Sequence, residues 1–353
     1  MDFALSTEQL DLAGAERAWL AKHDPILHRR ADIDDGPARI PADARKHVVE
    51  SGLAGLLTEA AGGTNVDLLV LTEEHGRAGS AVPLAEIAVA AAVLERVGHP
   101  AAVAASAGEV IVIPVASAGT LAVRVAGDTL HISGTTSPAT GLVDADHILL
   151  LAETDDGREV AAVIGAGDVT VSPADTLDLL RSWAKVEVDL TLGVWQWSFL
   201  PAGTTRAVCE QIAVFRAVDA LGCADRLLAM TVEYAGQRTQ FGSAIGSFQA
   251  VKHHLANMAV AVEASRATLW AAALALDEKE GPERTRAVSS AVAFACRSAS
   301  DVGQLALQVH GGIGFTWEHD VHLLIRRIKV DELLDGSVRE HRRRLVSATT
   351  VNH

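Results

Sequence analysis

The chain has 353 residues, of which 49% are hydrophobic and 21% charged, and its net charge is −15 at pH 7. This length is sufficient for two or three domains, and the apolar fraction excludes a disordered chain. The negative charge argues against a nucleic-acid-binding surface, because phosphate backbones attract basic proteins.

The cysteines and the N-terminus narrow the class of protein further. Cys209, Cys223 and Cys296 share no CxxC spacing, which argues against a disulfide framework or a zinc site. The first residues lack the basic and apolar regions of a signal peptide. No apolar run approaches the roughly 20 residues that cross a bilayer. We therefore expect a cytoplasmic protein with no metal, nucleic-acid or membrane partner.

Residues 1–108 are predicted to form an all-α domain. Ser6 is the expected N-cap of its first helix, and Gln9 completes a capping box. The apolar run 84–97 predicts a buried helix, with Pro83 suited to its first position. Because the run is short and contains Glu86, it is not expected to span a membrane.

Residues 109–202 are predicted to form a middle β domain, either a barrel or a sandwich. Short segments rich in Val, Ile and Leu are separated there by Gly, Asp, Ser and Thr, which is typical of strands and turns. The expected strands are 109–115, 120–125, 128–133, 147–153, 158–164 and 185–190.

Residues 203–353 are predicted to form a C-terminal four-helix bundle. Apolar side chains recur with the helical period in three long segments before Gly311, and a fourth helix is expected from about Asp320. The fold class is therefore a multidomain α+β protein with an α domain, a β domain and an α bundle.

Three short motifs in residues 203–353 could carry chemistry. Arg238 stands beside Phe241 and Gly242 between two predicted helices, where a guanidinium could bind an anion, although a structural loop explains the pattern equally. The stretch 308–315 has three glycines that would let backbone amides approach a ligand, but no strand precedes it as in a dinucleotide-binding fold. The third motif, 334–337, contains an Asp-Gly pair that a simple turn could explain.

Together, in this order and spacing, the three motifs resemble those of the acyl-CoA dehydrogenase family. The family's RxxFG corresponds to 238–242, its QxxGGxGF to 308–315, and the turn that carries its catalytic glutamate to 334–337. The resemblance implies an enzyme that oxidises acyl-CoA thioesters to 2-enoyl-CoA. A carboxylate removes the α-proton, FAD accepts the hydride, and an electron-transfer flavoprotein or similar acceptor reoxidises the flavin.

The resemblance also implies roles for individual residues. Asp335 takes the position of the catalytic base. The first two motifs correspond to residues that bind the ADP half of a neighbouring subunit's FAD. The implied cofactor-binding residues are Arg238, Gln240, Phe241, Ile245, Phe248, Gln249, Gln308, Gly311, Gly312 and Ser337.

The chain departs from the family pattern around the flavin ring. Asp335 replaces a glutamate and is shorter by one C–C bond, about 1.5 Å, and a misplacement of about 1 Å can cost on the order of 10²-fold in rate. The alternative base position of some members is Ile212, followed by Ala213. The family's TEPxAGSD-like segment corresponds to 113–120 and has lost its acidic residue and Ser-Asp pair. The WxT segment reads Pro138-Ala139-Thr140 and keeps only the threonine.

These departures are similar to those of the shorter, divergent subunits of actinobacterial α2β2 acyl-CoA dehydrogenases, several of which act on CoA thioesters of steroid side chains. That resemblance implies a hetero-oligomer in which flavin lies only at the heterodimer interface and one partner supplies the base. Two alternatives stay open at this point. One is a self-sufficient homo-oligomer with Asp335 as base, and the other is a structural subunit without flavin chemistry.

Overall fold

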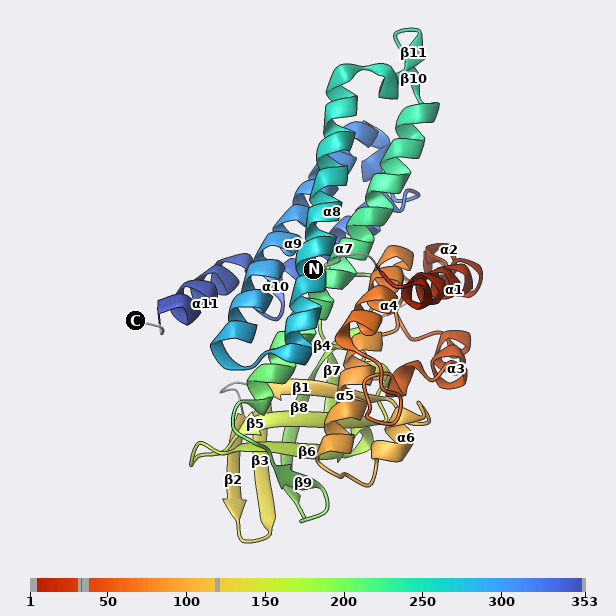
Figure 1. Cartoon of the computed structure of the whole chain (residues 1–353). Helices are drawn as coiled ribbons and strands as arrows, with labels where there is room; N and C mark the ends of the chain where they lie inside the picture. The colour runs from red at the N-terminus through yellow and green to blue at the C-terminus, as the bar shows by residue number, and fades with distance from the viewer. Residues whose placement is uncertain (1–4, 31–32, 34–37, 118–120, 351–353) are drawn as a thin grey trace.

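The structure is a computed structural model that describes residues 5–30, 33, 38–117 and 121–350. Three long helices extend away from a pair of β-sheets at one end, and the N-terminal helices pack beside the junction (Figure 1). The three-part architecture confirms the predicted fold class. The predicted domain borders, 108/109 and 202/203, fall in connections between elements and stay predictions.

The N-terminal part of the chain is helical, as predicted. Ser6 accepts from the backbone N–H of Gln9, whose side chain accepts from the N–H of Ser6, so the expected capping box is present. Pro83 is the N-cap of α5 and not its first helical residue, because its ψ of 64° is not helical. The helices are α1 (Thr7–His23), α2 (Ile26–Arg30), α3 (Ala42–Glu50), η1 (Leu53–Gly55), α4 (Asn65–Ala78), α5 (Leu84–Arg96) and α6 (Ala102–Ser106).

The middle part forms two sheets, and every expected strand segment overlaps an observed strand. One sheet has the order β1-β5-β6-β9, and the other has the order β2-β3-β8-β4, with β7 also paired to β8. The pairing of β1 with β5 is parallel. The strands are β1 (Val112–Ser117), β2 (Leu121–Ala126), β3 (Thr129–Thr135), β4 (Ala139–Thr140), β5 (His147–Glu153), β6 (Glu159–Gly165), β7 (Thr170–Pro173), β8 (Trp183–Leu192) and β9 (Trp197–Phe199).

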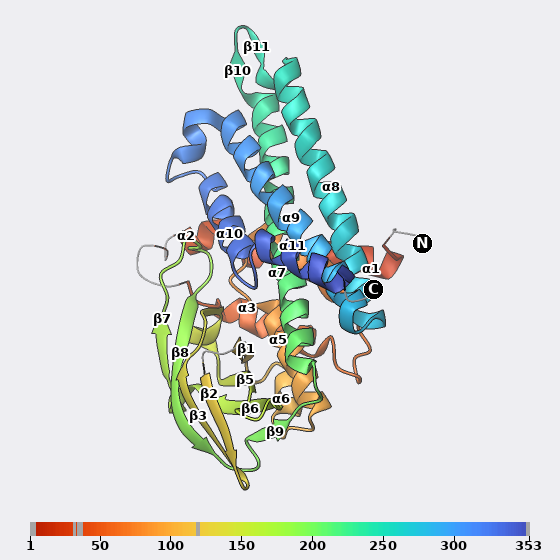
Figure 2. The ribbon, with the colours of Figure 1, turned by 90° about the vertical axis from the view of Figure 1, so that its left-hand side faces the viewer.

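The C-terminal part is the predicted bundle with one further helix, α11. The long helices α7, α8 and α9 run antiparallel, so the α7–α8 and α9–α10 joints lie at the end farthest from the sheets (Figure 2). The elements are α7 (Thr204–Gln237), β10 (Thr239–Gln240), β11 (Ser243–Ala244), η4 (Ile245–Ser247), α8 (Gln249–Glu278), α9 (Gly281–His310), η5 (Gly311–Phe315), α10 (Val321–Leu333) and α11 (Val338–Thr350).

Helix α8 is unusually apolar, since an 18-residue stretch of its 30 residues has a mean hydropathy of 1.3. Length and composition alone would allow α8 to cross a membrane. The helix instead packs lengthwise in the bundle, beside α7 and α9 (Figures 1 and 2).

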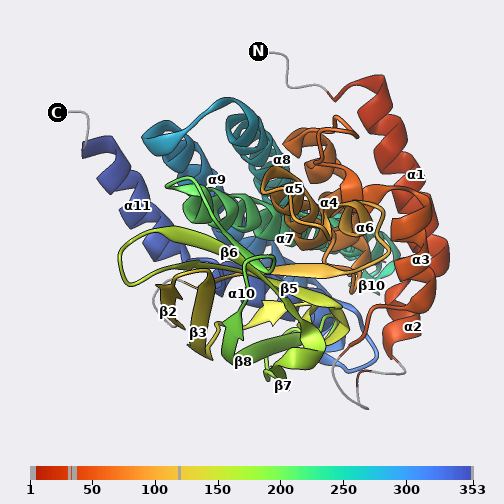
Figure 3. The same ribbon diagram turned by 90° about the horizontal axis from the view of Figure 1, so that it is seen from below.

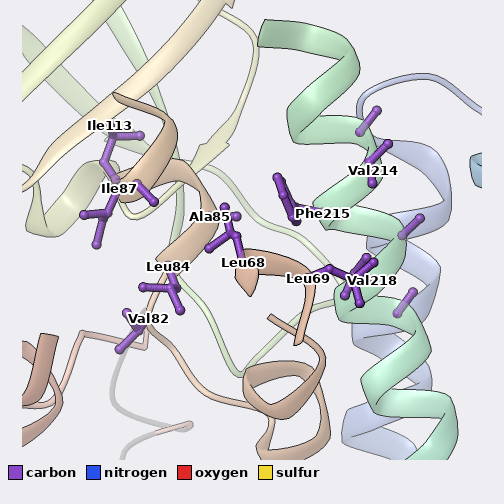
Figure 4. Close-up of a cluster of buried hydrophobic side chains, with 14 of the residues drawn as sticks. Leu68, Leu69, Val82, Leu84, Ala85, Ile87, Ile113, Val214, Phe215 and Val218 are labelled. Carbon is purple, nitrogen blue, oxygen red and sulfur yellow. The ribbon is translucent and has the colours of Figure 1, made fainter. Parts of the chain in front are cut away.

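A shared core joins the three parts of the chain. Ile113 of β1, Ile87 of α5 and Phe215 of α7 are each at most 3% exposed, and they belong to one cluster of buried side chains (Figure 4). Seen from below, the sheets lie across the lower ends of α5 and α7 (Figure 3). This packing brings the first sheet, α5 and the start of α7 together.

A buried ionic network fixes α10 against α7 and the segment that leads into β8. Arg327 donates to both carboxylate oxygens of Asp219, at 2.7 and 2.5 Å, and to the carbonyl of Ser80 at 2.6 Å. Arg181 donates to Asp178 at 2.8 Å and to Asp331 at 2.7 Å. Burial alone would raise the pKa of Asp219, but the charges of Arg181 and Arg327 hold that pKa well below its usual range.

Candidate functional site

A cavity of about 400 Å³ lies where β1, β4, α5, α7 and the α10–α11 joint meet. It brings the predicted base, Asp335, together with parts of the three segments in which the sequence departs from the family pattern. The lining residues are Glu86, Pro114, Val115, Ala116, Ser137, Pro138, Ala139, Thr140, Trp183, Val208, Cys209, Ile212, Arg216, Leu333, Leu334, Asp335 and Arg344. Of the segment 113–120, residues 118–120 lie outside the described residues.

Asp335 sits on a tight turn directly after α10. Its φ is 60°, a left-handed conformation that asparagine and aspartate tolerate better than most side chains. Its carbonyl accepts a hydrogen bond from His341 at 3.2 Å. A Cβ on the following Gly336 would lie 3.1 Å from His341 and 3.2 Å from Arg344. The turn is therefore braced by α11, and the Asp335 carboxylate is 31% exposed.

Arg216 of α7 contacts that carboxylate, although it stands in none of the three sequence motifs. Its Nε donates to Asp335 Oδ2 at 3.1 Å, and its Nη2 pairs with Glu86 Oε1 at 2.7 Å. Burial lowers the pKa of Arg216, but the charges of Glu86 and Asp335 outweigh it and raise that pKa above its usual value. The sequence feature that could have indicated a cation here is Glu86, because a glutamate inside a buried helix needs a partner.

Thr140 is the one residue of the lost WxT pattern that the sequence retains, and its hydroxyl lies at the cavity. Thr140 is 1% exposed, and its Oγ1 has no hydrogen-bond partner among the described residues. It stands opposite Trp183 in the β4–β8 pairing. Buried hydroxyl groups are normally hydrogen-bonded. A flavin ring edge, which carries carbonyl and imino groups, suits this hydroxyl.

The first predicted cofactor motif lies at the far end of the bundle. Arg238 is exposed at the end of α7 and has no ion-pair partner in the part of the chain that the structure describes. Phe241 is 94% exposed, and its ring meets Phe248 edge-on at 6.2 Å. Ile245 is half-buried, whereas Gln240 and Gln249 are exposed. The Arg238 guanidinium, which can bind an anion, and the Phe241 ring are therefore both accessible from outside.

The second motif lies at the same end. Gly311 has a φ of 60° and ends α9, and a Cβ built on Gly311 or Gly312 would have no atom within 4 Å. Their backbone is therefore open to an approaching ligand. Just before them, His310 stacks on Tyr234 of α7 at 4.6 Å, so the ends of α7 and α9 are joined. Gln308, two residues before His310, is exposed.

The two sets of predicted residues are far apart within one chain. Arg216 and Arg238 are 22 residues apart on or at the end of one helix, and a rise of 1.5 Å per residue separates them by about 33 Å. Only Ser337 of the predicted cofactor residues lies near Asp335. Its Oγ donates to Glu340 at 2.9 Å and accepts from the N–H of that residue, so it caps α11.

Comparisons with known proteins identify the family. Residues 206–349 match the model of the acyl-CoA dehydrogenase C-terminal domain. The acyl-CoA dehydrogenase IpdE2 of Mycolicibacterium smegmatis is 32% identical over 289 residues, which are 78% of this chain and 82% of that protein. The acyl-CoA dehydrogenase FadE27 of Mycobacterium tuberculosis is 29% identical over 98% of both chains.

Solved structures agree with this result. A chain of the ChsE4-ChsE5 complex from Mycobacterium tuberculosis superposes with a TM-score of 0.90, at 25% identity and over 99% of both chains. The protein belongs to the acyl-CoA dehydrogenase family, whose members are FAD-dependent oxidoreductases. The family predicted from the three motifs is therefore confirmed, while the roles of the individual residues stay predictions.

Proposed function

We propose that the chain is a subunit of an FAD-dependent acyl-CoA dehydrogenase whose flavin lies at an interface with a second acyl-CoA dehydrogenase subunit. The observation that carries a flavin site shared between two chains is the separation of about 33 Å between the cavity and the exposed bundle end. One flavin cannot contact both within one chain. Two chains can bring the bundle end of one to the cavity of the other. The similarity to a chain of the ChsE4-ChsE5 complex supports an assembly of two different subunits.

The residues at each place have the chemistry that this arrangement requires. When bound, FAD supplies the acceptor for the hydride that leaves the β-carbon of the thioester. Asp335 takes the α-proton on its carboxylate, and the double bond forms between the two carbons. Arg238 and the open backbone at Gly311 would hold the phosphates of a neighbour's cofactor. Apolar Val208 and Ile212 keep water from the reacting carbons.

The acyl group that fits best is bulky, and we propose the side chain of a steroid. Val208 also lines a second cavity of about 650 Å³, which is bounded by α5, α7 and the α8–α9 joint. A structure described as a steroid acyl-CoA dehydrogenase, Tcur3481-Tcur3483, shares this fold with a TM-score of 0.88.

A self-sufficient homo-oligomer is the second candidate function. It is favoured by the presence of Asp335 and the unpartnered Thr140 hydroxyl in one cavity of this same chain. Both candidates use a shared flavin, but only the second binds it without another gene product. A purely structural subunit would contain no flavin in any preparation.

Reduction of the bound flavin by substrate tests the proposed activity. The chain is co-expressed with a neighbouring acyl-CoA dehydrogenase gene, and acyl-CoA thioesters from short chains to a steroid side chain are added without oxygen. We expect the absorbance of oxidised flavin to bleach, fastest with the bulky thioester, and the product to be lighter by two hydrogen atoms. Bound flavin that none of these thioesters reduces would contradict the proposed dehydrogenation. Electron-transfer flavoprotein then serves as the acceptor for continuous turnover.

A further inference from the structure

Arg216 is a buried cation in the wall of the 400 Å³ cavity. Its side chain is 6% exposed, although it lies on α7 beside the apolar residues of the core. A buried guanidinium is costly unless its donors are used. Two of them are, since Nε donates to Asp335 and Nη2 to Glu86. The chain therefore keeps a charge here that helix packing alone does not require.

The guanidinium is fixed from three sides. Glu86 holds it from α5 at 2.7 Å and is itself only 9% exposed in its side chain. The ring of Trp183 from β8 lies 5.1 Å from the guanidinium carbon, which is within the range of a cation–π contact. The third contact is Asp335. Since Glu86 and Trp183 come from elements of the rigid core, the position of Nε does not depend on the turn that carries Asp335.

Asp335 is the group that needs such support. It is one methylene shorter than the glutamate of related enzymes, and its own backbone is in the left-handed conformation of a turn. Its Oδ2 accepts from Arg216, whereas its Oδ1 has no hydrogen-bond partner among the described residues. A carboxylate held by one oxygen has a defined orientation and keeps the other oxygen free for a proton.

We infer that Arg216 is a positioning residue for Asp335. Its Nε holds Oδ2 so that Oδ1 is presented to the α-hydrogen of the acyl-CoA, and Glu86 holds Arg216 in place. This inference rests on the proposed function, in which Asp335 is the base. It assigns to an arginine of α7 the task of compensating for a base that is too short.

The test compares variants in a Glu86→Gln background, because removing Arg216 alone would leave Glu86 buried without a counter-ion. The first of four proteins carries Glu86→Gln alone. The second adds Arg216→Gln, the third adds Asp335→Asn, and the fourth carries all three substitutions. Each is co-expressed with the partner subunit, and flavin content, thermal midpoint, acyl-CoA Kd and the single-turnover rate of flavin reduction are measured. The cycle shows whether Arg216 acts through Asp335.

We expect Arg216→Gln to slow flavin reduction by about 10²-fold with Asp335 present, because the carboxylate is then displaced by about 1 Å or more. With Asn at position 335, the same change should alter the rate by no more than about twofold. Flavin content and acyl-CoA Kd should stay unchanged throughout. With Glu86 present, Arg216→Lys keeps the positive charge, so its flavin should be reduced faster than in the Arg216→Gln protein.

Three results would overturn the inference. Equal losses in both backgrounds would give Arg216 a general structural role. A faster reaction without Arg216 would make the ion pair a brake on Asp335. A weaker acyl-CoA Kd at an unchanged rate would make Arg216 a substrate-binding residue. If the native protein and the Glu86→Gln protein bind flavin but no acyl-CoA reduces it, the proposed function itself fails, and this outcome is distinct from the other three.

Discussion

Replacement of Asp335 by asparagine is expected to slow the reduction of flavin by acyl-CoA by about 10²- to 10⁴-fold, the usual contribution of a positioned base. Asparagine has nearly the same shape, and its amide oxygen can still accept the hydrogen bond that Arg216 donates to Asp335 at 3.1 Å. The amide cannot take the α-proton. Flavin content should therefore be unchanged, because the loss is confined to chemistry. Rapid mixing of the flavin-loaded protein with acyl-CoA measures the rate.

The matched control is Asp335→Glu, which introduces the longer base of related enzymes. Its carboxylate is still a base and can still pair with Arg216, so we expect a rate well above that of Asp335→Asn. An unchanged rate in Asp335→Asn would remove Asp335 from the mechanism. The base would then belong to the partner subunit.

Replacement of Arg327 by methionine is expected to lower the free energy of unfolding by about 3–5 kcal/mol, the usual cost of breaking a buried ion pair. Arg327 is 1% exposed and holds both oxygens of Asp219. Methionine fills much of the volume but leaves that carboxylate buried, and it also leaves the carbonyl of Ser80 without its donor. The lost ion pair joins α7 to α10, and both helices flank the cavity.

Urea unfolding followed by circular dichroism measures this loss against a surface control. Arg343 is 76% exposed in its side chain and lies 4.0 Å from Glu340. Arg343→Met should leave the unfolding midpoint unchanged within error, because exposed pairs are screened by water and salt. A loss of less than about 1 kcal/mol for Arg327→Met would show that Asp219 finds another partner or water.

The fold was largely predictable because its elements are long and periodic. The stripes on α7, α8 and α9 extend over eight turns or so at 3.6 residues per turn, and Ser6 with Gln9 announces the first helix. The strands β4, β7 and β9 were missed because two to four residues contain too little of a pattern. The helix α11 was not among the predicted elements because charged residues dominate its first two turns and leave no apolar stripe there.

The candidate site was predictable only where its residues stand in motifs. Arg238, Gly311 and Asp335 belong to short patterns with fixed spacing. Arg216, Glu86 and Trp183 belong to none, because each comes from a different element and only the folded chain brings them together. The distance between the bundle end and the cavity also follows from the path of α7 and not from the order of the motifs.

The flavin-to-protein ratio tests the central claim, a flavin that needs a second subunit, most directly. It is measured by absorbance after purification of the chain alone and of the chain co-expressed with its neighbouring acyl-CoA dehydrogenase subunit. We expect almost no flavin in the chain alone and bound flavin in the complex, with a clear loss in Arg238→Gln. A stoichiometric flavin in the isolated chain would contradict the need for a partner.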